Sequence, residues 1–131
     1  MSQENVKVVC EAWEAYGRRD NEAVFALYDA DVEIQALHGF DDRVFRGLTG
    51  VQEFWRDWLA SWGESGSDVE EWIDAGENVI AVMHLWGRGR RSGAPVETRQ
   101  SHVWTLRGGK LWRLRVYDTR DEALKAVGLE E

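Results

Sequence analysis

The run RGGKLWRLRVYDTRDEALKAVGL, residues 107–129, contains a turn, a strand and a helix, and it decides the fold of the chain. Its Gly-Gly pair marks a tight turn. After this turn, apolar and polar residues alternate from Lys110 to Asp118, which predicts a strand. Thr119 and Glu122 have the spacing of a capping box, so a short helix is expected next, ending at Gly128.

Several strand-like runs precede this segment. They extend from Asp68 to Asp74, from Asn78 to Arg88 and from Pro95 to Leu106, and short turn sequences separate them. Such short connections favour antiparallel hairpins. A further strand is expected to begin near Asp31, where the hydrophobic period changes from 3.6 to 2.

Helical patterns fill the N-terminal half. Apolar residues from Val6 to Tyr16 recur at spacings of three and four, which predicts a first helix, and Asp20 can cap a second, short one. In TGVQEFWRDWLASWG, Thr49 and Gln52 have capping-box spacing, and Gly63 is expected to end a third helix. This order predicts an α+β fold with helices packed on a curved antiparallel sheet.

Composition limits the classes of protein that remain. The chain has 131 residues, which predicts one domain over 1–131, and its formal charge of −8 disfavours binding to nucleic acid. No run approaches the roughly 18 apolar residues of a membrane-spanning helix. The single cysteine, Cys10, is compatible with a reducing compartment, so we expect a cytoplasmic protein that binds neither nucleic acid nor membrane.

Four segments carry a resemblance to a known family: EAYGRRDNEAVFALYDADVEI, FRGLTGVQEFWRDWLASW, IDAGENVIAV and RQSHVWTLRGGKLWRLRVYDTRDEALKAVGL. Together they resemble the NTF2-like (cystatin-like) α+β roll, and within it the SnoaL-like branch. The resemblance implies a cone-shaped roll in which three helices of the N-terminal half and a curved antiparallel sheet enclose one deep pocket, with a short C-terminal helix. Proteins of this fold have many functions, so function has to be argued from the pocket.

The catalytic groups of characterised branches are replaced here. The resemblance places the steroid-isomerase base at Ile34 and the oxyanion-hole positions at Ala12 and Ser101. None of these side chains supplies the chemistry of that branch. The positions that correspond to the charged groups of limonene-type epoxide hydrolases are apolar in this chain, namely Met83, Leu85 and Val116.

Strand alternation and the resemblance together predict a tryptophan-rich pocket, although tryptophans at helical spacing also occur in ordinary cores. A small hydrophobic molecule, flat or polycyclic, is the expected ligand. The residues expected to line the pocket are Trp13, Tyr16, Ile34, Trp55, Trp58, Met83, Leu85, Ser101, Val103, Trp112, Leu114 and Val116.

An enzyme is the alternative interpretation, and the sequence leaves the choice open. In that case an isomerase, cyclase or hydratase acts on a polyketide-like or terpenoid-like compound. His38 and Asp118 would exchange protons at the pocket mouth, and Arg99 would stabilise negative charge. Asp118 has a competing role in capping the helix that follows it.

The opposite face of the sheet is expected to pair with a second copy, because it would otherwise expose many large side chains. These residues are His84, Trp86, His102, Trp104, Arg113, Arg115 and Tyr117. A third interpretation is a dimeric interaction module with a filled cone. The three histidines lie on separate segments without metal-ligand spacing, so neither a metal nor a cofactor is expected. A register slip of one residue on the middle strands would exchange the two faces.

Overall fold

The computed structural model describes residues 2–18, 20–36, 44–60, 62–89 and 92–129. Its helices are α1 (Ser2–Gly17), α2 (Asn21–Ala26), α3 (Gly47–Ala60) and α4 (Arg120–Ala126). Its strands are β1 (Tyr28–Ala36), β2 (Val44–Arg46), β3 (Trp62–Ala75), β4 (Asn78–Gly89), β5 (Pro95–Arg107) and β6 (Lys110–Tyr117).

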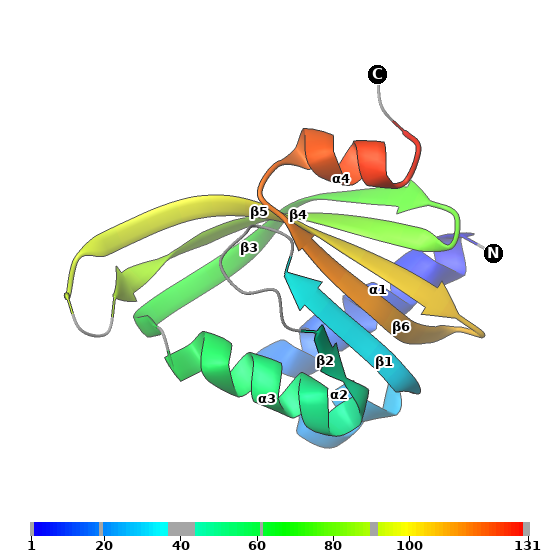
Figure 1. The fold of residues 1–131 in the computed structure, drawn as a ribbon, viewed down its shortest axis with the longest axis horizontal. Coiled ribbons are helices and arrows are strands. Elements are labelled where there is room, and N and C mark those ends of the chain that lie inside the picture. The colour runs from blue at the N-terminus through cyan, green and yellow to red at the C-terminus, as the bar shows by residue number, and fades with distance from the viewer. Residues whose placement is uncertain (1, 19, 37–43, 61, 90–91, 130–131) are drawn as a thin grey trace.

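The strands form one open sheet in the order β2-β1-β6-β5-β4-β3 (Figure 1). The three long hairpins β3–β4, β4–β5 and β5–β6 are antiparallel, as expected. β1 is parallel to β6, so the sheet is mixed rather than wholly antiparallel. The edge strand β2 has three residues, too few to show a hydrophobic period, and the sequence did not indicate it.

Helices cover the two faces of this sheet unequally (Figure 1). α1, α2 and α3 lie on one side, which we call the inner face, and α4 packs on the other, outer face against β4, β5 and β6. The largest apolar cluster lies on the inner face and includes Val32, Ile34, Leu111 and Leu114. A smaller cluster joins Ala123 and Leu124 of α4 to the outer face.

Two of the expected helix caps are confirmed. The Asp20 side chain accepts a hydrogen bond from the backbone N–H of Ala23 at 3.2 Å, and Thr119 accepts one from Glu122 at 3.2 Å. The capping box expected at Thr49 is wrong, because α3 follows β2 directly and begins at Gly47. That helix also ends at Ala60, and the backbone is extended again before Gly63.

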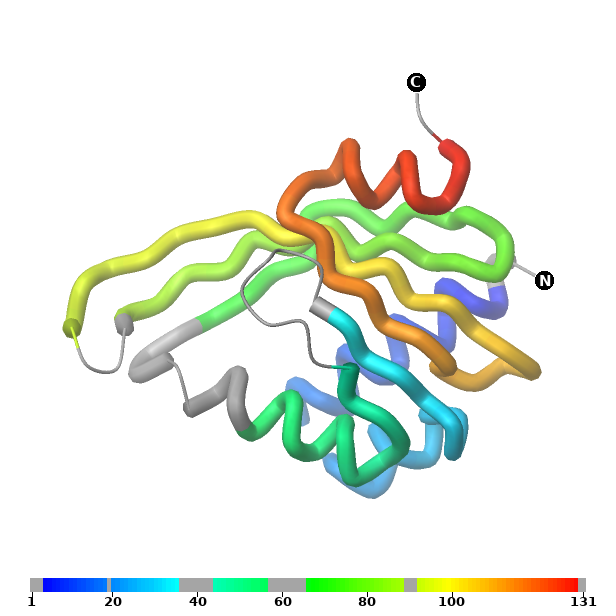
Figure 2. Tube along the Cα trace, viewed as in Figure 1, coloured from blue at the N-terminus to red at the C-terminus, as the bar shows by residue number. Residues whose placement is uncertain are grey.

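The long strands β4 and β5 bend along their length, which Figure 2 shows as an arc in the tube. Bulges interrupt the pairing of β3 with β4 and of β5 with β6. A bulge adds one residue to one strand and increases its local twist and bend. The inner face is therefore concave, and space remains between it and α1.

Candidate functional site

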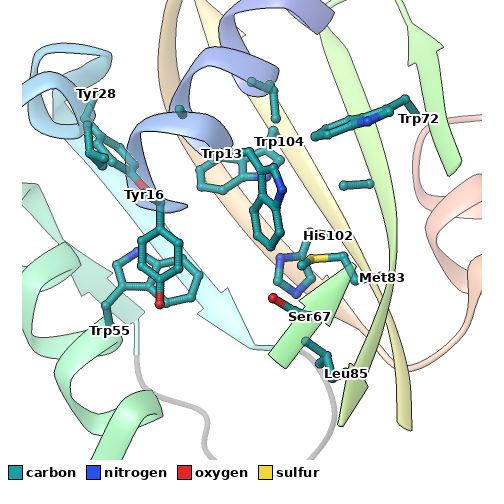
Figure 3. A pocket seen from close by; sticks show the side chains of 14 residues that line it. Trp13, Tyr16, Tyr28, Trp55, Ser67, Trp72, Met83, Leu85, His102 and Trp104 are labelled. Carbon is teal, nitrogen blue, oxygen red and sulfur yellow. The ribbon is translucent and has the colours of Figure 1, made fainter. Parts of the chain in front are cut away.

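A cavity of about 70 Å³ lies between the concave inner face and α1 and is partly open to solvent (Figure 3). Most of its lining is apolar or aromatic. The lining residues come from every described helix except α4 and from four strands of the sheet; they are Val9, Ala12, Trp13, Tyr16, Val24, Tyr28, Trp55, Ser67, Trp72, Ala81, Met83, Leu85, His102 and Trp104.

Aromatic rings form a connected part of this wall. Trp13 stacks on Tyr16, with ring centroids 6.2 Å apart, and Tyr16 lies 5.7 Å from Trp55. The rings of Tyr28 and Trp104 are 6.0 Å apart. These separations lie in the range that aromatic pairs prefer, so the rings hold one another in place without a ligand.

The Tyr28 hydroxyl is neutral at physiological pH. Burial raises the pKa of Tyr28 to about 12, and a hydrogen bond with Trp55 partly opposes that effect. The indole N–H can only donate, so the phenol oxygen accepts this bond. A neighbouring phenol, Tyr16, adds to the increase in the pKa of Tyr28.

His102 is the one histidine in the described cavity wall. It is 4% exposed, and its Nε2 lies 3.3 Å from Oε1 of Gln100. Figure 3 shows its ring at the cavity together with Met83 and Ser67 of the sheet and Trp13 of α1, which line the same space. The wall therefore combines an apolar surface with a hydrogen-bonding corner.

The sequence placed His102 and Trp104 on the outer face, and this was wrong. In the register, His102 pairs with Ala81 and Trp104 pairs with Val79, whose side chains point inward. Ser101 and Val103 consequently point outward, toward α4, and do not line the cavity. Because neighbouring residues of a strand face opposite sides, the one-residue error in β5 exchanged all four positions.

Trp112 also differs from its expected place in the pocket. Its ring lies under the guanidinium carbons of Arg107 and Arg113, which are 4.5 Å and 4.1 Å from its centroid. In β6 the buried residues Leu111 and Leu114 are three apart, because the bulge opposite the end of β5 adds a residue to the alternation. Trp112 therefore stacks with cations outside the cavity.

Of the other expected pocket residues, five line the cavity, three lie in the core, and one side chain is not described. Trp13, Tyr16, Trp55, Met83 and Leu85 line the cavity. Three more are 0–1% exposed in the main core and do not reach the cavity: Ile34, Leu114 and Val116. The side chain of Trp58 lies outside what the structure describes.

Neither of the two described candidates for catalysis, Arg99 and Asp118, lies in the cavity wall. Arg99 is exposed, and its Nε donates to Oε1 of Glu70 at 2.8 Å. Asp118 is exposed beyond the end of β6, and neither it nor Arg99 lines the cavity. His38 lies outside the described residues. Thr119, rather than Asp118, is the N-cap of α4.

Five of the residues expected at a subunit interface do point away from the cavity. His84 contacts Oε1 of Glu97 at 2.7 Å, and Trp86 is 39% exposed. Arg113 lies 3.7 Å from a carboxylate oxygen of Glu33. Arg115 donates to the Tyr117 hydroxyl at 3.4 Å.

Sequence reasoning missed several lining residues. A signal existed for Val9 and Ala12, which share the apolar stripe of α1 with Trp13 and Tyr16. No comparable signal existed for Ser67 or Trp72, because only the bulged register of β3 directs these side chains inward. Lining the cavity is a property of the assembled sheet.

Two further findings concern the described residues only. No three His, Cys, Asp or Glu side chains among them gather in a way that could hold a metal ion. Within the same residues, no helix has the length and apolar character required to cross a membrane.

Residues 9–114 match the family model of the SnoaL-like domain. No curated protein matches the chain significantly. An NTF2-like protein of unknown function from Burkholderia pseudomallei K96243 has a similar structure, with a TM-score of 0.78 and 23% identity over 97% of this chain and 98% of that chain.

Two other solved structures are similar. A protein described as a SnoaL-like polyketide cyclase from Jannaschia sp. CCS1 is 19% identical over 100% of this chain and 96% of that chain, with a TM-score of 0.75. A protein of ketosteroid isomerase-like fold from Catenulispora acidiphila DSM 44928, in complex with trimethylamine, is 16% identical over 93% and 92%, with a TM-score of 0.71.

These likenesses confirm the α+β roll expected from the sequence. Because the family match begins in α1 and extends into β6, it includes most of the cavity wall described above. Its fold is that of NTF2-like proteins, and this chain belongs to the SnoaL-like domain family.

Proposed function

We propose that this protein binds a small, mainly apolar molecule in the cavity between α1 and the sheet. The observation that carries the proposal is the lining, which is apolar and aromatic except at a few hydrogen-bonding groups. Such a lining is typical of sites for small organic ligands. A volume of about 70 Å³ is smaller than the roughly 150 Å³ of an engineered cavity that binds benzene. Because the cavity is also partly open to solvent, a single ring can extend into its mouth, and the volume favours such a compact ligand over a flat polycyclic one.

Features of relatives support a small ligand. The Catenulispora protein holds trimethylamine, and the Jannaschia protein is described as a polyketide cyclase. The presence of a cavity disfavours the third interpretation, an interaction module whose cone is filled by side chains. We infer that binding of a small molecule is the property that this protein shares with these relatives, whether or not a reaction follows.

An isomerase, cyclase or hydratase acting on a polyketide-like or terpenoid-like compound is the second candidate. The observation that favours it is the histidine in the wall, because imidazole is the side chain that most often exchanges protons near neutral pH. His38, Asp118 and Arg99 stay proposed catalytic groups. The latter two would have to act from outside the described cavity.

The test of binding fills the cavity from the sheet. Ala81 is 2% exposed and lies in the wall, so Ala81→Leu places a larger apolar side chain in the space. We expect the affinity for a panel of single-ring compounds, terpenoids, steroids and trimethylamine to fall at least about tenfold for every member that binds. Tryptophan fluorescence and calorimetry measure binding, and mass spectrometry detects conversion.

Ala126→Leu is the matched control, because Ala126 is exposed on α4 and far from the lining. It should leave every affinity unchanged. If the wild-type protein captures no member of the panel, or if Ala81→Leu binds as tightly as the wild type, the cavity is not the binding site. Conversion of a compound would favour the enzyme.

The proposal also includes a homodimer formed through the outer face, in the cytoplasm. The apolar side chain of Trp86 there supports it, because 39% of its surface is exposed. His84, Arg113, Arg115 and Tyr117 belong to the same proposed interface. His102 and Trp104 do not, because they point into the cavity.

A further inference from the structure

We propose that the ligand is a small aromatic compound with a hydroxyl group, a phenol or an enol, and that the His102 imidazole binds this hydroxyl. The inference rests on the proposed function and deepens it, because it names the chemical class that the same cavity prefers. Its starting point is the contrast within the wall between aromatic rings and one buried imidazole.

The lining disfavours a charged ligand. Among the described lining residues there is no Lys, Arg, Asp or Glu, and burial keeps the Tyr28 phenol neutral by raising its pKa. Moving an ion from water into such a wall without an opposite charge is costly. A neutral molecule avoids that cost.

The imidazole favours a hydrogen-bonding ligand over a hydrocarbon. In the tautomer whose Nε2–H donates to the amide oxygen of Gln100, Nδ1 of His102 is an acceptor. A ligand hydroxyl is a donor that matches an acceptor. His102 also has contacts within the chain, so the ligand hydroxyl shares or replaces one of them.

The rest of the wall favours an aromatic ring on that hydroxyl. Trp13, Tyr16 and Trp104 border the same space as His102 with their rings (Figure 3). Aromatic rings stack on one another in offset or edge-to-face geometry. A ring that carries a hydroxyl can contact both the aromatic wall and the imidazole.

Phenol and toluene form the first test, because they differ by one hydroxyl in place of one methyl group. In a purely apolar cavity, the cost of removing the hydroxyl from water should make toluene bind about tenfold more tightly. If His102 accepts the hydrogen bond, phenol should bind the wild-type protein at least as tightly as toluene. Calorimetry at neutral pH measures both dissociation constants.

Variants then assign the preference to one residue. His102→Phe keeps a ring of similar size, and we expect it to weaken phenol binding by about tenfold relative to toluene binding. His84→Phe is the matched control, because His84 lies on the outer face of the adjacent strand. This control variant should leave the ratio of the dissociation constants for phenol and toluene unchanged. Ser67→Ala tests the other nearby hydroxyl.

The outcomes separate the two proposals. If toluene binds about tenfold more tightly than phenol, or if His102→Phe leaves the ratio as in the wild type, the inference is overturned while cavity binding stands. A preference lost in Ser67→Ala but kept in His102→Phe also overturns it. If nothing in the whole panel binds, the proposed function itself fails. Should His102→Phe not fold, the ratio of the phenol and toluene dissociation constants is measured for the wild type and for His102→Gln, and these two values decide.

Discussion

Neighbouring residues at the start of β1 have opposite electrostatic environments. Burial raises the pKa of Tyr28 to about 12, whereas the backbone N–H of Asp31 and the guanidinium of Arg107 lower the pKa of Asp29. The reason is strand alternation, which directs the phenol toward the cavity and the carboxylate toward solvent. One step along the chain thus separates an apolar site from an exposed ion pair.

Tyr28 should make the protein less stable in alkali. The ordinary pKa of a tyrosine is about 10, so the folded state holds the phenol proton more tightly than the unfolded state does. This contribution to stability is complete below pH ~10 and is lost as pH rises through about 12. Between pH 8 and 11 the free energy of unfolding should fall by about 1–1.5 kcal/mol from this group.

Tyr28→Phe should remove that part of the pH dependence, at a cost of about 1 kcal/mol near neutral pH for the lost bond with Trp55. Urea unfolding at the two pH values measures the difference. An unchanged slope in Tyr28→Phe would contradict the assignment.

At the scale of elements, α3 lies very close to the edge strand β2. An ideal Cβ at Gly50 would be 2.9 Å from the backbone carbonyl carbon of Phe45. The rings of Phe45, Phe54 and Trp55 then form a chain, with centroid separations of 5.3 Å and 4.9 Å. This close approach positions the helix that carries Trp55 into the cavity wall.

Gly50→Ala should therefore destabilise the protein, although alanine is the better helix former by roughly 1 kcal/mol. The contact with Phe45 involves backbone, which cannot move as a side chain does, so we expect a net loss of about 1–3 kcal/mol. Gly17→Ala, at the end of α1, meets nothing within 4 Å and should be neutral or stabilising. Thermal and urea unfolding of both variants measure this difference, and equal effects would contradict it.

At the scale of the whole molecule, the two faces of the sheet differ in what covers them. The inner face holds the main core and the cavity, while α4 covers only part of the outer face. Trp86 on the outer face packs over Gly66, where an added Cβ would lie 2.5 Å from the indole ring. The uncovered surface beside it is where we expect a second copy to bind.

Trp86→Asp should weaken the proposed dimer, because it puts a charge where apolar surface would be buried. Light scattering and sedimentation at micromolar concentration measure the oligomeric state. Leu48→Asp is the control, since Leu48 is equally exposed, at 39%, but lies on α3. A wild-type monomer, or the same dissociation in both variants, would count against the interface.

The periodicity of the chain by itself determined the helices and the long strands, although not the short β2, and capping chemistry located Asp20 and Thr119. These signals are local, since they depend on residues within one or two turns. The three long antiparallel hairpins also followed from short connections. The sequence likewise identified the aromatic helix positions Trp13, Tyr16 and Trp55 as cavity residues.

Only the tertiary structure decided which face of β5 lines the cavity and which side chains of β6 are buried. Bulges and long-range strand pairing set which side chains face inward. A shift of one residue from the expected alternation places His102 in the cavity wall and Ser101 outside it. The parallel pairing of β1 with β6 likewise joins segments far apart in the chain. Side-chain alternation is known from a strand alone, but its direction is known only after the strands have paired, because pairing fixes which side the helices cover.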